Sequence, residues 1–141
     1  MTKITLYSAY ESDPILEKAG VWIVLAKDLE IKLASFGNDA HMEYLEKLQK
    51  PYKAQIRRDA LPKHIDEDIH CRAMAKEVIL DWRGEGWVDR DGKPLAYSVE
   101  NAYTLLSDPK MKKLKADIIY LATNNETFRQ MEEDKADAIK N

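Results

Sequence analysis

The sequence predicts a mainly α-helical protein of the α+β class, with a small N-terminal β-hairpin and a helical body of about five helices. Three observations lead to this prediction. A β-branched and aromatic run over 21–25 is followed by an alternating run over 29–33, which is the pattern of two short antiparallel strands. Gly37 and Asn38 then lead into apolar residues at helical spacing. Helical patterns continue over the rest of the chain.

The chain has 141 residues, of which 45% are hydrophobic, and this is the size and composition of one folded domain. We expect four parts: an N-terminal segment over 1–19, the hairpin over 20–37, the helical body over 38–124 and a C-terminal amphipathic helix over 125–141. The net charge of −3 is well mixed along the chain. A duplex-binding protein normally carries a basic face, so we expect no nucleic-acid partner.

The chain shows no feature of export or membrane insertion. Its N-terminus lacks the apolar core of a signal peptide, and no apolar run approaches the ~20 residues of a membrane span. Cys71 is the single cysteine, so an intrachain disulfide cannot form. These observations predict a soluble, cytoplasmic protein with no membrane partner.

The first elements are a polar segment and the hairpin. Asp13-Pro14 indicates a turn within 1–19. Residues 26–28 have the length of a hairpin loop. An isolated hairpin is marginally stable in water, so its apolar face must pack on the helices or on another subunit.

Trp22 is the first candidate for an interaction residue. It lies on the opposite face of its strand from Val21 and Ile23. In a one-sided hairpin this position is exposed unless a partner covers it. Core packing is the alternative, since tryptophan buries a large apolar area.

The helical body begins at Asn38 or Asp39, either of which can cap a helix. Pro51 interrupts the following pattern and predicts a kink or a break, and Pro62 fits the first turn of a new helix. The clearest helical pattern covers 63–82. Its broad apolar stripe includes Trp82, which we expect in the core.

The chain after Gly84 and Gly86 consists of a loop and shorter helices. The segment 89–94 is rich in turn residues, Ser98 can cap a helix that ends near 106, and Asp108-Pro109 begins the next one. The position of Trp87, which follows Gly86, stays open.

The last predicted helix follows a possible capping box formed by Thr123 and Glu126. Phe128, Met131 and Ile139 share its narrow apolar face, which we interpret as a surface for self-association or partner binding. Packing of this face on the body is the alternative.

No group of residues predicts catalysis, a metal or a cofactor. The segment 89–92 lacks two of the main ligands of a calcium loop, and a solvated turn explains it. His64 and His70 are six residues apart and cannot share one helical face as zinc ligands. Asp66 and His70 are spaced as a surface pair, and Cys71 has the character of a small buried residue. We therefore expect no enzyme.

An ordered set of short motifs extends from about residue 14 to the end of the chain. The motifs are Glu17-Lys18-Ala19-Gly20-Val21-Trp22, Ala34-Ser35-Phe36-Gly37-Asn38, Leu48-Gln49-Lys50-Pro51-Tyr52-Lys53, Ile56-Arg57-Arg58, Leu80-Asp81-Trp82, Asp91-Gly92-Lys93-Pro94-Leu95-Ala96-Tyr97-Ser98 and Phe128-Arg129. In their order and spacing the chain resembles the tail assembly chaperones of lambdoid long-tailed phages and prophages.

The resemblance implies a non-enzymatic, mainly helical protein that coats the tape-measure protein, recruits tail-tube subunits and leaves before the tail is complete. It also implies weak self-association. Many such proteins have a longer form made by programmed frameshifting, and Lys140 and Asn141 can be encoded by an adenine run that allows slippage. The alternative is another small morphogenesis protein, such as a head–tail completion subunit that stays in the virion.

Overall fold

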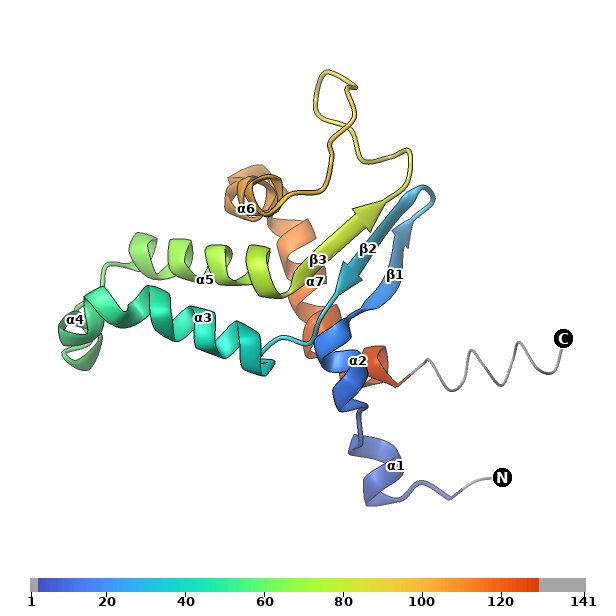
Figure 1. Ribbon diagram of the computed structural model, residues 1–141, viewed down its shortest axis with the longest axis horizontal. Helices are drawn as coiled ribbons and strands as arrows, with labels where there is room; N and C mark the ends of the chain where they lie inside the picture. The colour runs from blue at the N-terminus through green and yellow to red at the C-terminus, as the bar shows by residue number, and fades with distance from the viewer. Residues whose placement is uncertain (1–2, 130–141) are drawn as a thin grey trace, which may run out of the picture.

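The computed structural model describes residues 3–129, which form a mainly helical protein with a small antiparallel sheet, as predicted (Figure 1). The elements in chain order are α1 (Leu6–Tyr10), α2 (Pro14–Ala19), β1 (Val21–Ala26), β2 (Leu29–Leu33), α3 (Asp39–Gln49), the 3-10 helix η1 (Lys50–Tyr52), α4 (Lys53–Arg57), α5 (Lys63–Glu77), β3 (Ile79–Arg83), α6 (Val99–Ser107), η2 (Pro109–Met111), α7 (Lys112–Thr123) and η3 (Asn125–Phe128).

The sheet has the strand order β1-β2-β3, and both pairs are antiparallel. Ile31 pairs with Ile23 on one side and with Trp82 on the other, and these three residues share the face that packs on the core. Lys32 pairs with Trp22 and Asp81. Since residues directly opposite each other share a face, Trp22, Lys32 and Asp81 belong to the outer face of the sheet.

The third strand corrects the prediction of one helix over 63–82. Helix α5 ends at Glu77, and β3 follows after a single residue. Val78 and Trp82 are four apart, a spacing that fits a helical stripe, whereas Val78, Ile79 and Leu80 are a bulky apolar run that also suits a strand. Pairing with β2 decides between them, because it supplies backbone partners to both strands.

The core face of the hairpin packs on the chain's own helices, which answers the question of what covers it. Ile31 and Leu33 join one cluster with residues of α5, α6 and α7, including Met74, Leu106 and Ile118. Figure 1 shows α3 and α5 running side by side away from the sheet. A second, smaller cluster joins these two helices.

Several predicted helix boundaries are confirmed. The side chain of Asn38 accepts a hydrogen bond from the backbone of His41 and caps α3. The helical path is broken at Pro51, which lies in η1 between α3 and α4. Pro62 is the N-cap of α5, and Ser98 caps α6 through the backbone N–H of Asn101.

Two local predictions are wrong. Asp13-Pro14 does not form a simple turn, because Asp13 caps α2 and Pro14 is its first residue. Thr123 does not form a capping box: it ends α7, and its hydroxyl donates to the carbonyl oxygen of Ile119 at 2.7 Å. Asn124 caps the next short helix instead. Proline at the first position of a helix and asparagine as its cap are both favourable, which explains these outcomes.

Candidate interaction surface

Residues 3–19, which we call the N-terminal arm, extend beyond the sheet and the helical body (Figure 1). The arm contains α1 and α2. Thr5 and Ser8 form a capping box at the start of α1, since each side chain accepts a hydrogen bond from the other residue's backbone N–H. Asp13 and Pro14 start α2 in the same local way. Local capping therefore fixes two short helices that have little core of their own.

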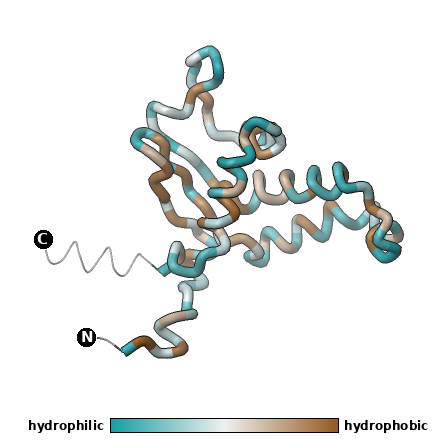
Figure 2. The backbone as a smooth tube through the Cα atoms, turned by 180° about the vertical axis from the view of Figure 1, so that it is seen from behind, coloured by the Kyte–Doolittle hydropathy of each residue, from teal (hydrophilic) through white to brown (hydrophobic). Residues whose placement is uncertain are grey.

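The arm concentrates exposed apolar side chains. Among the described residues, eleven large hydrophobic side chains are exposed, and five of these lie in the arm: Ile4, Leu6, Tyr7, Tyr10 and Ile15. Tyr10 and Ile15 are each 75% exposed. Figure 2 shows brown, hydrophobic stretches in this outlying part of the tube. Exposed apolar side chains that are close together in the chain are often found at sites for protein partners.

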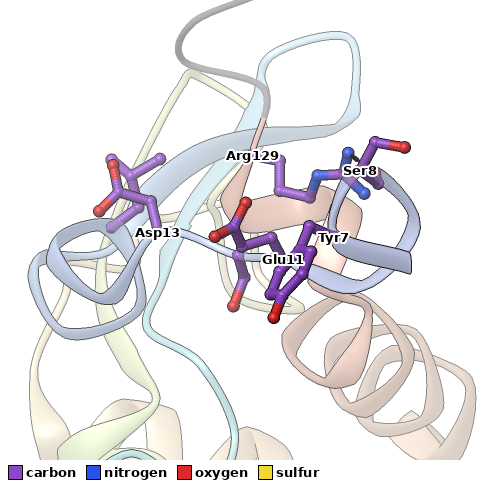
Figure 3. Close-up of a pocket in the computed structure, with 7 residues that line it drawn as sticks. Tyr7, Ser8, Glu11, Asp13 and Arg129 are labelled. Carbon is purple, nitrogen blue, oxygen red and sulfur yellow. Dashed lines mark hydrogen bonds between the residues drawn. The ribbon is translucent and has the colours of Figure 1, made fainter. Parts of the chain in front are cut away.

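The arm is attached to the body through η3 and Arg129. The Arg129 guanidinium donates to the carbonyl oxygen of Ala9 at 3.3 Å and also to that of Ser8. The backbone N–H of Asp13 donates to the carbonyl oxygen of Phe128 at 3.3 Å, and Leu16 is buried. Figure 3 shows Arg129 reaching toward Ser8, with Tyr7 and Glu11 nearby. The arm is thus held by a few polar contacts and one apolar anchor.

Two hollows accompany these contacts. The first, of about 320 Å³, lies between α1, the start of α2 and Arg129, and its lining is mostly polar, with Tyr7 and Leu16 as its apolar side chains (Figure 3). The second, of about 530 Å³, lies along α2 and is lined by Pro14, Ile15, Lys18 and Ala19. Apolar side chains beside shallow hollows offer places into which side chains of a partner can insert.

Trp22 lies on the outer face of the sheet, next to the arm in sequence. The Arg83 guanidinium carbon is 3.9 Å from the centroid of its ring, and Arg83 also pairs with Glu30 at 2.6 Å. The ring is therefore half-buried beneath a charged side chain and does not belong to the core. Val24, two residues further along the same face, is 66% exposed.

Phe128 corrects the interpretation of an interaction surface in favour of its alternative, packing on the body. It lies in η3 and its side chain is 1% exposed, so it packs in the interior and is not presented to a partner. The other predicted interaction residues, Met131 and Ile139, and the predicted frameshift residues Lys140 and Asn141, lie outside the described residues. The described chain ends at Arg129, beside α1.

The arm residues Leu6, Tyr7 and Tyr10 are interaction candidates that the sequence interpretation missed. A signal for them existed in the sequence. Thr5 and Ser8 have the spacing of a capping pair, and the apolar residues after Thr5 recur at helical intervals. What the sequence did not show was that this short helix leaves its apolar side chains uncovered.

The other residues considered for chemistry lie at separate places in the fold. Cys71 is buried, and His70 lies 3.4 Å from Asp66 as an i,i+4 pair. Trp82 is buried as expected, and Trp87 stacks on it with ring centroids 4.5 Å apart. No group of three or more His, Cys, Asp or Glu side chains within residues 3–129 has an arrangement suited to a metal ion.

A polar cluster joins α5 to α6. Asp68 accepts hydrogen bonds from the Tyr103 hydroxyl and from Arg72, the latter at 2.8 Å. The Tyr103 hydrogen bond, together with Arg72, lowers the pKa of Asp68, and Asp68 in turn raises the pKa of Tyr103. The guanidinium of Arg72 also lies 4.2 Å from the centre of the Tyr103 ring. These contacts fix the two helices together, and we assign no chemistry to them.

Comparison with known proteins places the chain in a family. Residues 36–141 match the family model described as YdaY prophage protein. This range covers most of the chain, so the protein belongs to the YdaY prophage protein family and is prophage-derived. The N-terminal arm and the β1–β2 hairpin precede the matched range. No curated protein and no solved structure matches the chain.

Among the helices within residues 3–129, none has the length and apolar character needed to cross a membrane.

Proposed function

We propose that this prophage protein is a non-enzymatic tail assembly chaperone, which binds the tape-measure protein and brings tail-tube subunits to it. The observation that carries the proposal is the concentration of exposed apolar side chains on the N-terminal arm. A long amphipathic helix that is not yet packed needs an apolar surface to cover it, and the arm offers one. The prophage origin of the family and the resemblance to tail chaperones support the same function.

The proposal assigns the first contact with the tape-measure helix to Leu6, Tyr7 and Tyr10. Tyr7 and Tyr10 are three residues apart in α1, so they lie on neighbouring positions of one helical face. Aromatic side chains of this type bury a large area at low entropic cost when a partner binds. Many copies along one tape-measure chain would then act together, which fits weak self-association of the chaperone.

Further parts of the proposal concern place and timing. The protein would act in the host cytoplasm, without a cofactor, and would be absent from the finished virion. Met131 and Ile139 remain proposed contributors to partner binding or self-association. Replacing both residues by Asp is expected to weaken partner binding or self-association. If neither interaction changes, Met131 and Ile139 do not belong to the interaction surface.

Co-expression with the tape-measure protein of the same prophage tests the function. The wild-type chain is expected to keep the tape-measure protein in the soluble fraction and to co-purify with it. The double variant Leu6→Ser and Tyr10→Ser should raise the dissociation constant by about tenfold, which corresponds to about 1.4 kcal/mol, and should therefore lower the soluble yield of the tape-measure protein. A matched double variant, Met42→Ser on α3 and Val99→Ser on α6, removes exposed apolar side chains elsewhere and should have no effect.

Two results would contradict the proposal. Tape-measure solubility that is the same with and without the chain would exclude the chaperone function. Stoichiometric amounts of the chain in purified particles would instead indicate the alternative, a head–tail completion subunit.

A further inference from the structure

Strand β1 forms one edge of the sheet, because β2 is its only neighbouring strand in the described part of the chain. Its six residues, Val-Trp-Ile-Val-Leu-Ala, carry no charge. Apart from its ladder with β2, no backbone hydrogen bond among residues 3–129 involves β1. An uncharged edge strand with unpaired N–H and C=O groups is a template for pairing with a further strand.

The other edge of the sheet is better covered. The Tyr97 hydroxyl donates to the carbonyl oxygen of Ile79 in β3 at 2.9 Å. The indole N–H of Trp82 donates to the carbonyl oxygen of Leu95 at 2.8 Å, so the segment that follows the loop is tied to β3. The two edges therefore differ, and β1 is the edge that remains open to a partner.

We infer that β1 pairs with β1 of a second copy of the chain in antiparallel orientation, around a two-fold axis at Ile23. Residues directly opposite each other in a sheet share a face. A two-fold axis at Ile23 therefore places Trp22 opposite Val24 of the second copy, and Val24 opposite its Trp22. Val24 is 66% exposed in the single chain, and this pairing would cover it with an indole ring.

The charges around β1 favour a second copy as the occupant. Two identical uncharged strands meet without any like-charge contact. The axis at Ile23 also sets the exposed Val24 of each copy against the Trp22 ring of the other, so the strand is complementary to itself. Trp22 also keeps its contact with Arg83, because that side chain lies on the outer face and not at the open edge.

A bulge limits the strength of the pairing. The ladder between β1 and β2 shifts register between Val24 and Ala26. Bulges twist an edge strand away from a regular partner, so the new ladder would be confined to Trp22–Val24, the residues that the axis at Ile23 pairs with one another. Such a short interface predicts a weak and reversible dimer. The inference rests on the self-association included in the proposed function and gives it a surface.

Sedimentation velocity on the isolated full-length chain tests the dimer. We expect a monomer–dimer equilibrium that shifts with concentration. Val24→Lys introduces a charge next to the open edge and should raise the dissociation constant by at least about tenfold, which corresponds to about 1.4 kcal/mol. Val88→Lys is the matched control, since Val88 is an exposed valine in the loop after β3, and it should leave the equilibrium unchanged.

Cysteine cross-linking tests the register independently. A mixture of the single variants Trp22→Cys and Val24→Cys should form a disulfide-linked heterodimer, because opposed residues in a sheet lie within disulfide distance. Each variant alone should cross-link much more slowly, because residue 22 does not lie opposite residue 22 of the second copy, nor residue 24 opposite residue 24. The native Cys71 is buried, so the wild-type chain gives the background rate of cross-linking.

Three results would overturn the inference: a chain that stays monomeric at the highest soluble concentration, a dimer that Val24→Lys does not weaken, or equal cross-linking of single variants and mixture. These measurements need no tape-measure protein. They can therefore overturn the dimer while the solubility assay supports the chaperone function, or support the dimer while that assay contradicts the function.

Discussion

The backbone N–H of Gly37 donates a hydrogen bond to Nδ1 of His41 over 2.8 Å. The imidazole is 0% exposed, and it meets the ring of Phe36 edge-on with centroids 4.7 Å apart. A nitrogen that accepts a hydrogen bond cannot be protonated without losing that bond. Burial, and to a smaller extent the charge of His70, lowers the pKa of His41. The folded protein therefore holds a neutral histidine at the entry to α3.

This burial predicts a loss of stability on acidification. The unfolded chain binds a proton to His41 near its ordinary pKa of about 6.5, whereas the folded chain binds it only at lower pH. The stabilisation is therefore complete above pH 6.5 and is lost as the pH falls through the lowered pKa. Its slope for one proton cannot exceed about 1.4 kcal/mol per pH unit.

Urea unfolding at pH 7 and at pH 5, followed by tryptophan fluorescence, measures this contribution. His41→Gln should reduce the difference in unfolding free energy between the two pH values, whatever its effect at pH 7. His64→Gln, at an exposed histidine, is the control and should leave the difference as in the wild type. An unchanged difference in His41→Gln would show that other groups cause the pH dependence.

A second prediction concerns Gly84, which follows β3 and has a φ of +120°. A Cβ at this position would lie 2.1 Å from the carbonyl oxygen of Asp28 in the hairpin turn, and the backbone there would have to move. Gly92 also has a positive φ, +80°, but a Cβ there meets nothing within 4 Å. We expect Gly92→Ala to cost about 1 kcal/mol and Gly84→Ala clearly more. Thermal unfolding of both variants checks this order, and equal losses would mean that the close approach is not rigid.

The helices and the hairpin could be predicted from the sequence because their signals are local. Asn38 and Ser98 mark the starts of helices through their own side chains. A turn separates the two strand patterns, although it is one residue shorter than the predicted 26–28 because Ala26 still pairs with Leu29. Strand β3 could not be predicted in the same way. Its residues also fit a helical stripe, and the choice depends on pairing with β2, which is about fifty residues away in the chain.

The candidate surface was predicted only in part. The outer position of Trp22 followed from alternation along a strand, which is a local property. The burial of Phe128 and the exposure of Tyr10 depend on how η3 and α1 meet, and no local pattern contains that information. The sequence therefore indicated where the strand face points, but not which of the terminal segments remains uncovered.

A third prediction uses the stacked indoles of Trp82 and Trp87, whose planes are 7° apart. Trp87 Nε1–H donates to the carbonyl oxygen of Glu30 at 3.0 Å, so this ring ties the loop after β3 to β2. Trp87→Phe should lose about 1 kcal/mol of unfolding free energy through the missing hydrogen bond, and Trp87→Ala about 3–5 kcal/mol through the lost packing. Urea unfolding checks both values. A loss below 1 kcal/mol for Trp87→Ala would mean that the loop is not held through this ring.

The last prediction tests how the N-terminal arm is held. Arg129 donates to the carbonyl oxygens of Ser8 and Ala9 at the end of α1, and the planar guanidinium can serve two acceptors at once. Arg129→Gln should therefore loosen α1 and speed chymotrypsin cleavage after Tyr7 and Tyr10, because cleavage requires local opening.

The unfolding free energy of the body should change by less than about 1 kcal/mol in the Arg129→Gln variant, because the contacts of Arg129 with α1 involve few buried groups. Arg90→Gln is the matched control: it breaks a surface ion pair with Asp108 far along the chain and should leave cleavage in the arm unchanged. If Arg129→Gln cleaves no faster than the control, Leu16 and the contact between Asp13 and Phe128 must hold the arm without the arginine. The orientation of Tyr7 and Tyr10 toward a partner would then depend on α2 and on the hydrogen bond from the Asn125 side chain to the carbonyl oxygen of Ala9.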